Sequence, residues 1–193
     1  PGDWAQLQSV FETVRKTLRM YGYEEYAASP LEPAELYESK TSEEIVNEQT
    51  FTFTDRGDRR VTLRPEMTPT LARMVAGKRR DLVFPVRWFN IGNRFRYERP
   101  QRGRMREFFQ IDVDVVGIAD ARADGEIIVL ASEVLKALGA SAGDFTIRIS
   151  SRKLLNAATE ALGYSADEAK QYLRLLDRKD KMSAEEFEEQ RAP

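Results

Sequence analysis

The chain has no cysteine and no histidine among its 193 residues, and these two absences exclude whole classes of site. Without cysteine there is no disulfide framework, no thiolate nucleophile and no zinc finger. Without histidine there is no Ser-His-Asp triad and no imidazole general base. A bound metal therefore has to be a hard cation on carboxylates, with Mg²⁺ as the first choice. The lack of cysteine is compatible with a reducing cytoplasm, where we expect the protein to reside.

An excess of one charge and a long apolar run are also missing. The 30 Lys and Arg nearly balance the 32 Asp and Glu, which leaves a net charge of −2 and no overall positive field for nucleic acid. No run approaches the roughly 20 apolar residues of a membrane-spanning helix, and the first residues lack a basic, apolar signal segment. We therefore expect a soluble chain that does not enter a membrane and is long enough for a sizeable core.

Apolar spacing predicts helices towards both ends of the chain, with strands mostly between them. The predicted helices cover 3–20, 121–138, 154–162 and 166–190, with a further helix that starts at Thr68 as N-cap. Runs of β-branched and aromatic residues predict strands at 51–54, 60–63, 85–91, 93–99, 105–116 and 145–149. Strands follow one another through short turns, without steady alternation with helices. This order predicts an α+β fold with a mixed, mainly antiparallel sheet flanked by helices.

The strands 93–99 and 105–116 carry the most informative pattern, because alternate side chains share one face of a strand. One face is apolar, and the other holds Arg94, Arg96, Glu98, Arg104, Arg106, Phe108, Gln110, Asp112 and Asp114. A solvated sheet face shows the same alternation, but this one uses four arginines and no lysine. Guanidinium groups bind phosphate or carboxylate oxygens in pairs, and a phenylalanine offers a flat surface to a base. The pattern indicates a nucleotide beside a small cationic or amphoteric molecule.

A second candidate is the segment LRPEMTP, residues 63–69, between a predicted strand and a predicted helix. A tight turn there would present Glu66, whose carboxylate can hold an ammonium group, and Thr68. Thr68 also suits an ordinary N-cap, and both roles remain open. The chain has neither the glycine fingerprint of a dinucleotide site nor a P-loop.

Three segments, in this order, resemble the class II aminoacyl-tRNA synthetases and, within that class, the histidyl-tRNA synthetase family. The segment YGYEEYAASPLE (21–32) is similar to the end of motif 1, which builds the homodimer interface in that class. LRPEMTP (63–69) resembles the family's histidine-binding turn. FRYERPQRGRMREFFQ (95–110) resembles motif 2 in its histidyl form. The resemblance spans most of the chain and implies a class II synthetase-like fold.

The resemblance implies a role for each polar residue. Arg96 is the implied catalytic residue: it holds the ATP α-phosphate and stabilises charge as the substrate carboxylate attacks phosphorus. The implied ATP contacts are Arg96, Glu98 on the adenine amino group, Arg104 on phosphate or substrate, and Phe108 stacked on the base. The implied histidine contacts are Glu66 and Thr68 on the ammonium group, and Gln110 and Asp114 facing the imidazole. The family commonly has Glu at the position of Asp114, which is one methylene longer.

The implied reaction joins L-histidine and ATP to histidyl-adenylate, with Mg²⁺ bridging phosphates, and then transfers histidine to tRNA(His). In-line attack by a positioned carboxylate needs little proton transfer, so a chain without histidine residues can run it. The resemblance implies a cytoplasmic homodimer joined through motif 1.

The implied domain organisation is part of a class II catalytic core over 1–164, with motif 1 at about 4–32 and motif 2 at about 88–117. Residues 165–193 resemble the start of the family's helical insertion. The family's motif 3 and anticodon-binding domain are absent from this sequence. We therefore expect an N-terminal catalytic fragment that is weakly active or inactive by itself.

Two other readings remain open. The regulatory subunit of ATP phosphoribosyltransferase in histidine biosynthesis resembles the same domain without aminoacylating, although it has no need of an adenine-and-phosphate face. A pure interaction domain, such as the synthetase-like module of a stress kinase or a polymerase accessory subunit, predicts erosion of the polar face. The polar face is intact in this sequence, which favours the synthetase.

Overall fold

The structure is a computed structural model that describes residues 1–38, 50–97, 103–179 and 182–191. It divides the chain into two compact units, with the first ending at Phe145 and the second beginning at Thr146. Every predicted site residue belongs by sequence to the first unit.

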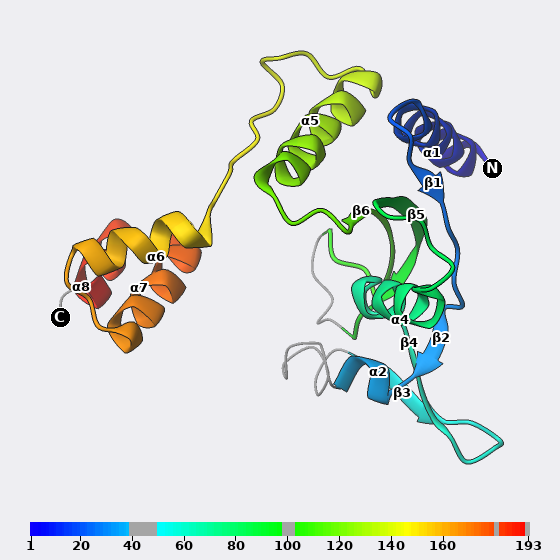
Figure 1. The fold of residues 1–193 in the computed structure, drawn as a ribbon, viewed down its shortest axis with the longest axis horizontal. Coiled ribbons are helices and arrows are strands. Elements are labelled where there is room, and N and C mark those ends of the chain that lie inside the picture. The colour runs from blue at the N-terminus through cyan, green and yellow to red at the C-terminus, as the bar shows by residue number, and fades with distance from the viewer. Residues whose placement is uncertain (39–49, 98–102, 180–181, 192–193) are drawn as a thin grey trace. The chain divides into compact units, whose positions relative to one another are not determined.

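The first unit is built on two three-stranded sheets (Figure 1). One sheet has the order β1 (Glu24–Glu25), β5 (Val86–Phe95) and β6 (Glu107–Val116). In it β1 runs parallel to β5, and β5 pairs antiparallel with β6. The other sheet is antiparallel throughout, with the order β2 (Leu31–Pro33), β4 (Arg60–Leu63) and β3 (Phe51–Thr54). The predicted α+β fold with a mixed, mainly antiparallel sheet is confirmed.

Helices cover both faces of the sheet that contains β5. On one face α1 (Gly2–Met20) and α5 (Ala121–Ala137) lie side by side (Figure 1). The core between these helices and the sheet comprises Val14, Leu18, Tyr23, Phe89 and Leu130. On the other face α4 (Thr68–Lys78) packs through a smaller cluster comprising Tyr26, Met67 and Leu71, with Trp88 against it. A short helix, α2 (Glu35–Glu38), adds the buried Tyr37. The polar face of β5 and β6 is therefore the face on the α4 side.

The second unit consists of α6 (Arg152–Ala161), α7 (Ala166–Arg178) and α8 (Ala184–Arg191). The predicted helix over 166–190 is two helices, because Ser183 caps a new helix by accepting from the backbone N–H of Glu186 at 3.1 Å. None of the helices in the described ranges is long and apolar enough to cross a membrane.

The predicted strands 85–91 and 93–99 are one continuous strand, β5. The predicted ranges leave out Gly92, but its backbone stays in the strand and is the register partner of Gln110 on β6. A glycine inside a strand can also mark a place where another group approaches closely. At Gly92 that group is the side chain of Arg64.

The strand predicted at 145–149 is absent: the described backbone there is neither strand nor helix. A strand needs a neighbour to pair with, and this segment adjoins the boundary between the two units, where no described strand lies beside it. Ile149 is accordingly 69% exposed.

Candidate active site

The register of β5 against β6 places those predicted residues that lie within the two strands on one face: Arg94, Phe108, Gln110, Asp112 and Asp114. The directly opposed pairs along this face are Arg94–Phe108, Gly92–Gln110, Asn90–Asp112 and Trp88–Asp114. Opposed residues of an antiparallel pair project to the same side, so two short stretches of sequence share one surface. Asn90 and Trp88 lie outside the pattern that the sequence indicated, because their place depends on the register.

Arg94 is buried and serves the protein itself, which corrects its predicted place among the ligand-binding guanidinium groups. Its side chain is 0% exposed, donates to Asn90 Oδ1 at 2.8 Å and forms an ion pair with the Asp112 carboxylate. Asn90 in turn donates from Nδ2 to the backbone oxygen of Tyr26 at 2.7 Å. A buried charge has to be paired in this way, and the result is a fixed polar layer beneath the exposed part of the face.

Asp112 connects this buried layer to a predicted site residue, Gln110. One Asp112 oxygen is paired with Arg94, and the other accepts from Gln110 Nε2 at 2.7 Å. The bond orients the Gln110 amide, with its nitrogen towards Asp112 and its oxygen away from it. A ligand group that meets this oxygen must be a hydrogen-bond donor.

Asp114 lies two residues further along the same face and is a perturbed carboxyl group. Burial first, and the negative charge of Asp112 second, raise the pKa of Asp114 to about 6. A nearby cation or N–H donor would stabilise the ionised form. The Asp114 end of the face is therefore suited to a cationic or N–H-donating ligand.

Arg96 lies at the other end of the face and joins it to the turn before α4. Its Nε donates to the backbone oxygen of Pro65 at 3.0 Å, and its Cζ lies 5.4 Å from the centre of the Phe108 ring. A guanidinium group thus stands between an aromatic ring and the segment that carries Glu66. This juxtaposition of segments 31 residues apart is the central feature of the site.

The turn before α4 carries Glu66 and Thr68, and its structure shows whether Thr68 is the N-cap of the helix. Thr68 is the first helical residue, the N-cap position belongs to Met67, and no side chain caps the helix. The N-cap role of Thr68 is therefore wrong, and its side chain is exposed. The backbone oxygen of Glu66 accepts from the Tyr37 hydroxyl at 3.2 Å, so buried Tyr37 braces the turn.

Arg64 is a structural residue that the sequence gave no reason to select. It is 6% exposed, and its guanidinium donates to the backbone oxygens of Asn93 at 3.0 Å and Ala28 at 2.8 Å. A Cβ on Gly92 would lie 2.8 Å from Arg64 Nη2, so the glycine makes room for the arginine. The signal in the sequence was the glycine inside a strand.

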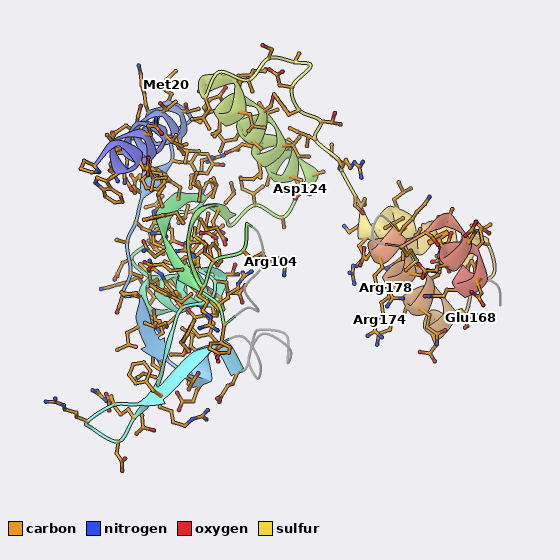
Figure 2. The ribbon with its side chains drawn as sticks, turned by 180° about the vertical axis from the view of Figure 1, so that it is seen from behind. Met20, Arg104, Asp124, Glu168, Arg174 and Arg178 are labelled. Carbon is orange, nitrogen blue, oxygen red and sulfur yellow. The ribbon has the colours of Figure 1, made fainter. Side chains whose placement is uncertain are left out.

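The remaining predicted residues lie at the mouth of the face. Arg104 is exposed in the segment just before β6 (Figure 2). Arg106 stacks on Tyr97, with its Cζ 4.2 Å from the ring centre, and so is not directed at the ligand face as predicted. Glu98, the predicted adenine contact, lies outside the described residues. In the described ranges no three acidic side chains cluster to hold a metal ion.

The arrangement has two chemically distinct ends. Arg96 and Phe108 offer a fixed positive charge next to a ring, which suits a phosphate next to a base. Gln110 and Asp114 offer acceptors, which suit a polar or cationic side chain. Along β5 and β6 the two ends are about six residues apart, or about 20 Å at roughly 3.3 Å per residue. One face can therefore accommodate a nucleotide and a small amphoteric molecule together.

Comparison with known proteins identifies the family of the chain. A family model described as histidyl-tRNA synthetase matches residues 1–192. The histidine–tRNA ligase of Leptospira biflexa is 44% identical over 188 residues, which are 97% of this chain and 43% of that protein. The ligase of Opitutus terrae is 42% identical over 187 residues, again 97% of this chain and 43% of the relative. The chain thus spans less than half the length of these curated relatives.

Solved structures share the fold. A protein from Bacillus halodurans C, described as an ATP phosphoribosyltransferase regulatory subunit/histidyl-tRNA synthetase, superposes with a TM-score of 0.80 at 27% identity, over 94% of this chain and 46% of that one. The histidyl-tRNA synthetase of Nostoc sp. PCC 7120 also gives 0.80, at 24% identity, over 98% of this chain and 43% of that one, and supports the fold alone. With the family model matching nearly the whole sequence and curated relatives above 40% identity, the chain belongs to the histidyl-tRNA synthetase family.

Proposed function

We propose that the protein activates L-histidine with ATP to form histidyl-adenylate and pyrophosphate, and then transfers histidine to tRNA(His). The observation that supports this most directly is the position of Arg96, between the Phe108 ring and the turn that carries Glu66 and Thr68. An activating enzyme has to hold a nucleotide phosphate and an amino acid against each other, and this guanidinium group adjoins both candidate subsites.

ATP binds at the Arg96 end of the face. Phe108 stacks on adenine, while Arg96 holds the α-phosphate and Arg104 contacts phosphate from the exposed segment before β6. Glu98 contacts the adenine amino group. Two parts of this assignment have geometric support: the Arg96–Phe108 distance of 5.4 Å and the exposure of Arg104.

Histidine binds with its ammonium group at the turn and its side chain along β6. Glu66 and Thr68 contact the ammonium group, Gln110 accepts from an N–H of the ligand, and Asp114 faces the imidazole. The hydrogen bond from Gln110 Nε2 to Asp112 supports the role of Gln110 as an acceptor, because it leaves the amide oxygen as the group that can meet the ligand.

The reaction is an in-line displacement at phosphorus. A carboxylate oxygen of histidine forms a bond to the α-phosphorus, and the bond from that phosphorus to the pyrophosphate oxygen breaks. Arg96 neutralises charge on the α-phosphate oxygens as this happens, without proton transfer. Mg²⁺ bound with the phosphates of ATP would neutralise part of their charge. Among the described residues no three acidic side chains cluster to hold a metal ion.

The experiment that tests this function is ATP–pyrophosphate exchange by the full-length protein, with each amino acid in turn. Exchange with histidine alone supports the synthetase. Histidine binding without exchange contradicts it and favours the regulatory reading. Arg96→Ala should lower exchange by about 10²–10³-fold, because a charge-stabilising donor is lost. Arg106→Ala, which removes a group stacked on exposed Tyr97, is the matched control and should retain exchange.

We further propose that the protein is a cytoplasmic homodimer joined through α1 and residues 21–32. In support, α1 leaves apolar side chains exposed, with Val10 at 38% and Met20, at its C-terminal end, at 76% (Figure 2). Light scattering during gel filtration should give twice the monomer mass. Met20→Glu should shift the protein towards monomer, since it places a charge on the contact. A monomeric wild type would contradict the proposal.

A further inference from the structure

Two consecutive carbonyl groups in the turn before α4 are each held by a side chain from another element. The Pro65 oxygen accepts from Arg96 Nε at 3.0 Å, and the Glu66 oxygen accepts from the Tyr37 hydroxyl at 3.2 Å. The helix itself takes the next carbonyl, that of Met67, which accepts from a backbone N–H one turn along at 2.9 Å. The Glu66 carbonyl therefore lies just before the helix, and Tyr37 holds it.

These two contacts fix the direction in which the Glu66 side chain leaves the backbone. A peptide group is planar, so a hydrogen bond to its oxygen orients the whole plane. The planes on both sides of the Glu66 Cα are held in this way, and together they set the direction of its Cα–Cβ bond. The neighbours Pro65 and Met67 are buried, and Glu66 is more exposed than either. The turn therefore presents Glu66 in one direction, away from the core.

The surroundings of Tyr37 determine where its proton goes. Tyr37 is 1% exposed and lies on α2, which packs against both β2 and α4. A carbonyl oxygen can only accept, so the single hydroxyl proton is used at Glu66, and the Thr70 hydroxyl at 3.0 Å must donate to the Tyr37 oxygen. Burial raises the pKa of Tyr37, and the bond with Thr70 lowers it in part, as expected when Thr70 donates. The phenol therefore stays protonated.

We propose that Tyr37 is a positioning residue of the amino-acid subsite: its hydroxyl holds the Glu66 carbonyl so that the Glu66 carboxylate meets the ammonium group of the bound amino acid. This inference rests on the proposed function. Because Tyr37 is buried, it acts through Glu66 and does not touch the ligand. A charge-assisted hydrogen bond depends on distance and angle, so a turn released on one side binds the ammonium group less tightly. The contact joins residues 29 apart in the sequence, where no local pattern indicates it.

Tyr37→Phe in the full-length protein removes the hydroxyl and keeps the ring in the core. The KM for histidine in ATP–pyrophosphate exchange should rise about 10-fold, because a charge-assisted contact is loosened. The KM for ATP should stay unchanged, because the lost bond is to Glu66 and not to Arg96 or Phe108. The thermal midpoint should fall, because a buried hydrogen bond is lost.

Thr70→Val is the matched control, because it removes the other hydrogen bond of the same hydroxyl. Thr70 is 0% exposed, and valine has a similar shape. The bond from Tyr37 to Glu66 remains, so the thermal midpoint should fall as in Tyr37→Phe while the KM for histidine stays unchanged. If Thr70→Val raises this KM as much, affinity follows the stability of the fold and the proposal is wrong. An unchanged KM for histidine in Tyr37→Phe overturns it equally.

Calorimetric titration of wild type and Tyr37→Phe with L-histidine separates this inference from the proposed function. If the wild type shows no exchange but binds histidine, and the variant binds about 10-fold more weakly, adenylate formation is disproved while the role of Tyr37 stands. If both proteins bind histidine equally, the role of Tyr37 is disproved whatever the exchange assay shows. A wild type that does not bind histidine disproves both.

Discussion

Two neighbouring carboxylates on β6, Asp112 and Asp114, have different tasks because their surroundings differ. Asp112 is paired with buried Arg94 and with Gln110, which fixes it in place. Asp114 is partly buried next to the charge of Asp112, and its pKa is raised to about 6 by burial first and that charge second. A carboxylate held in a costly ionised state is suited to a cationic or N–H-donating ligand.

The raised pKa of Asp114 makes the folded state less stable as the pH rises. The folded state binds the proton more tightly than the unfolded state, whose carboxyl has the ordinary value of 3.8. This group's contribution is therefore present at pH 4 and lost as the pH rises through 6, by about 3 kcal/mol at most. Asp114→Asn should be more stable than wild type at pH 7 and equal at pH 4. Urea unfolding at both values measures this, and a pH-independent difference would contradict it.

For individual residues, the sequence predicted which side chains share the polar face. It did not predict which of them are buried in contacts within the protein, as Arg94 is. Strand alternation is a local property, so Phe108, Gln110 and Asp114 were assigned correctly to one side. The burial of Arg94 depends on Asn90 and Asp112 meeting across two strands, which is a matter of register. The roles of the individual residues in binding remain predictions.

At the scale of elements, one ionic contact joins α5 to β5 and to the segment after α1. Arg87 on β5 donates to both oxygens of Glu126 on α5, at 2.6 and 2.8 Å. The Tyr23 hydroxyl donates to the same carboxylate at 2.7 Å. The pKa of Glu126 is lowered to about 2. The largest cause is its hydrogen bonding with Arg87, and the second is its hydrogen bond with Tyr23.

Glu126→Gln should destabilise the fold by about 1–2 kcal/mol at pH 7, because a charge-assisted pair becomes neutral. The folded-state pKa lies below the ordinary 4.5, so this stabilisation is present above pH 4.5 and lost as the pH falls through 2. The difference from wild type should therefore shrink between pH 4.5 and 2 in thermal unfolding.

Glu133→Gln is the matched control on the same helix. Glu133 pairs with Lys136 at 2.8 Å, but the lysine side chain is 52% exposed, and exposed pairs contribute little. A loss as large as that of Glu126→Gln would show that charge on α5, rather than this contact, stabilises the fold.

The predictions of helices and strands were correct where the local sequence determines the structure. They failed where contact with a distant segment determines it. Apolar spacing located α1 and α5 within a few residues. The strand predicted at 145–149 had the right composition, yet it has no partner strand. Position 92 was left between two predicted strands, yet Gly92 lies inside one strand and its missing Cβ makes room for Arg64.

At the scale of the whole molecule, the chain divides into two compact units after Phe145, while the family's catalytic core over 1–164 remains a prediction. The reason is that α6 packs against α7 and so joins the second unit. Such a contact between helices is not readable from spacing alone. The assignment of 165–193 to a family insertion remains a prediction.

The segment between α5 and α6 should be the first site of proteolysis. It has no helix or strand over residues 141–150, apart from a turn, and Arg148 there is exposed. Brief digestion with trypsin, followed by mass spectrometry, should yield a persistent fragment that ends at Arg148. Early cleavage at the arginines of β5 would contradict the division into units, since proteases cut exposed, locally opened segments before paired strands.

The hydrogen bonds of Arg64 to distant segments have a consequence for the order of folding. Its guanidinium binds backbone oxygens of Ala28 and Asn93, and its own backbone bonds those of Pro30 and Phe95. These partners are dozens of residues apart along the chain, and such non-local contacts form late. We therefore expect the turn with Glu66 and the strand with Gly92 to reach their final register late in folding. During refolding, we expect ligand affinity to return last, after most of the helix content.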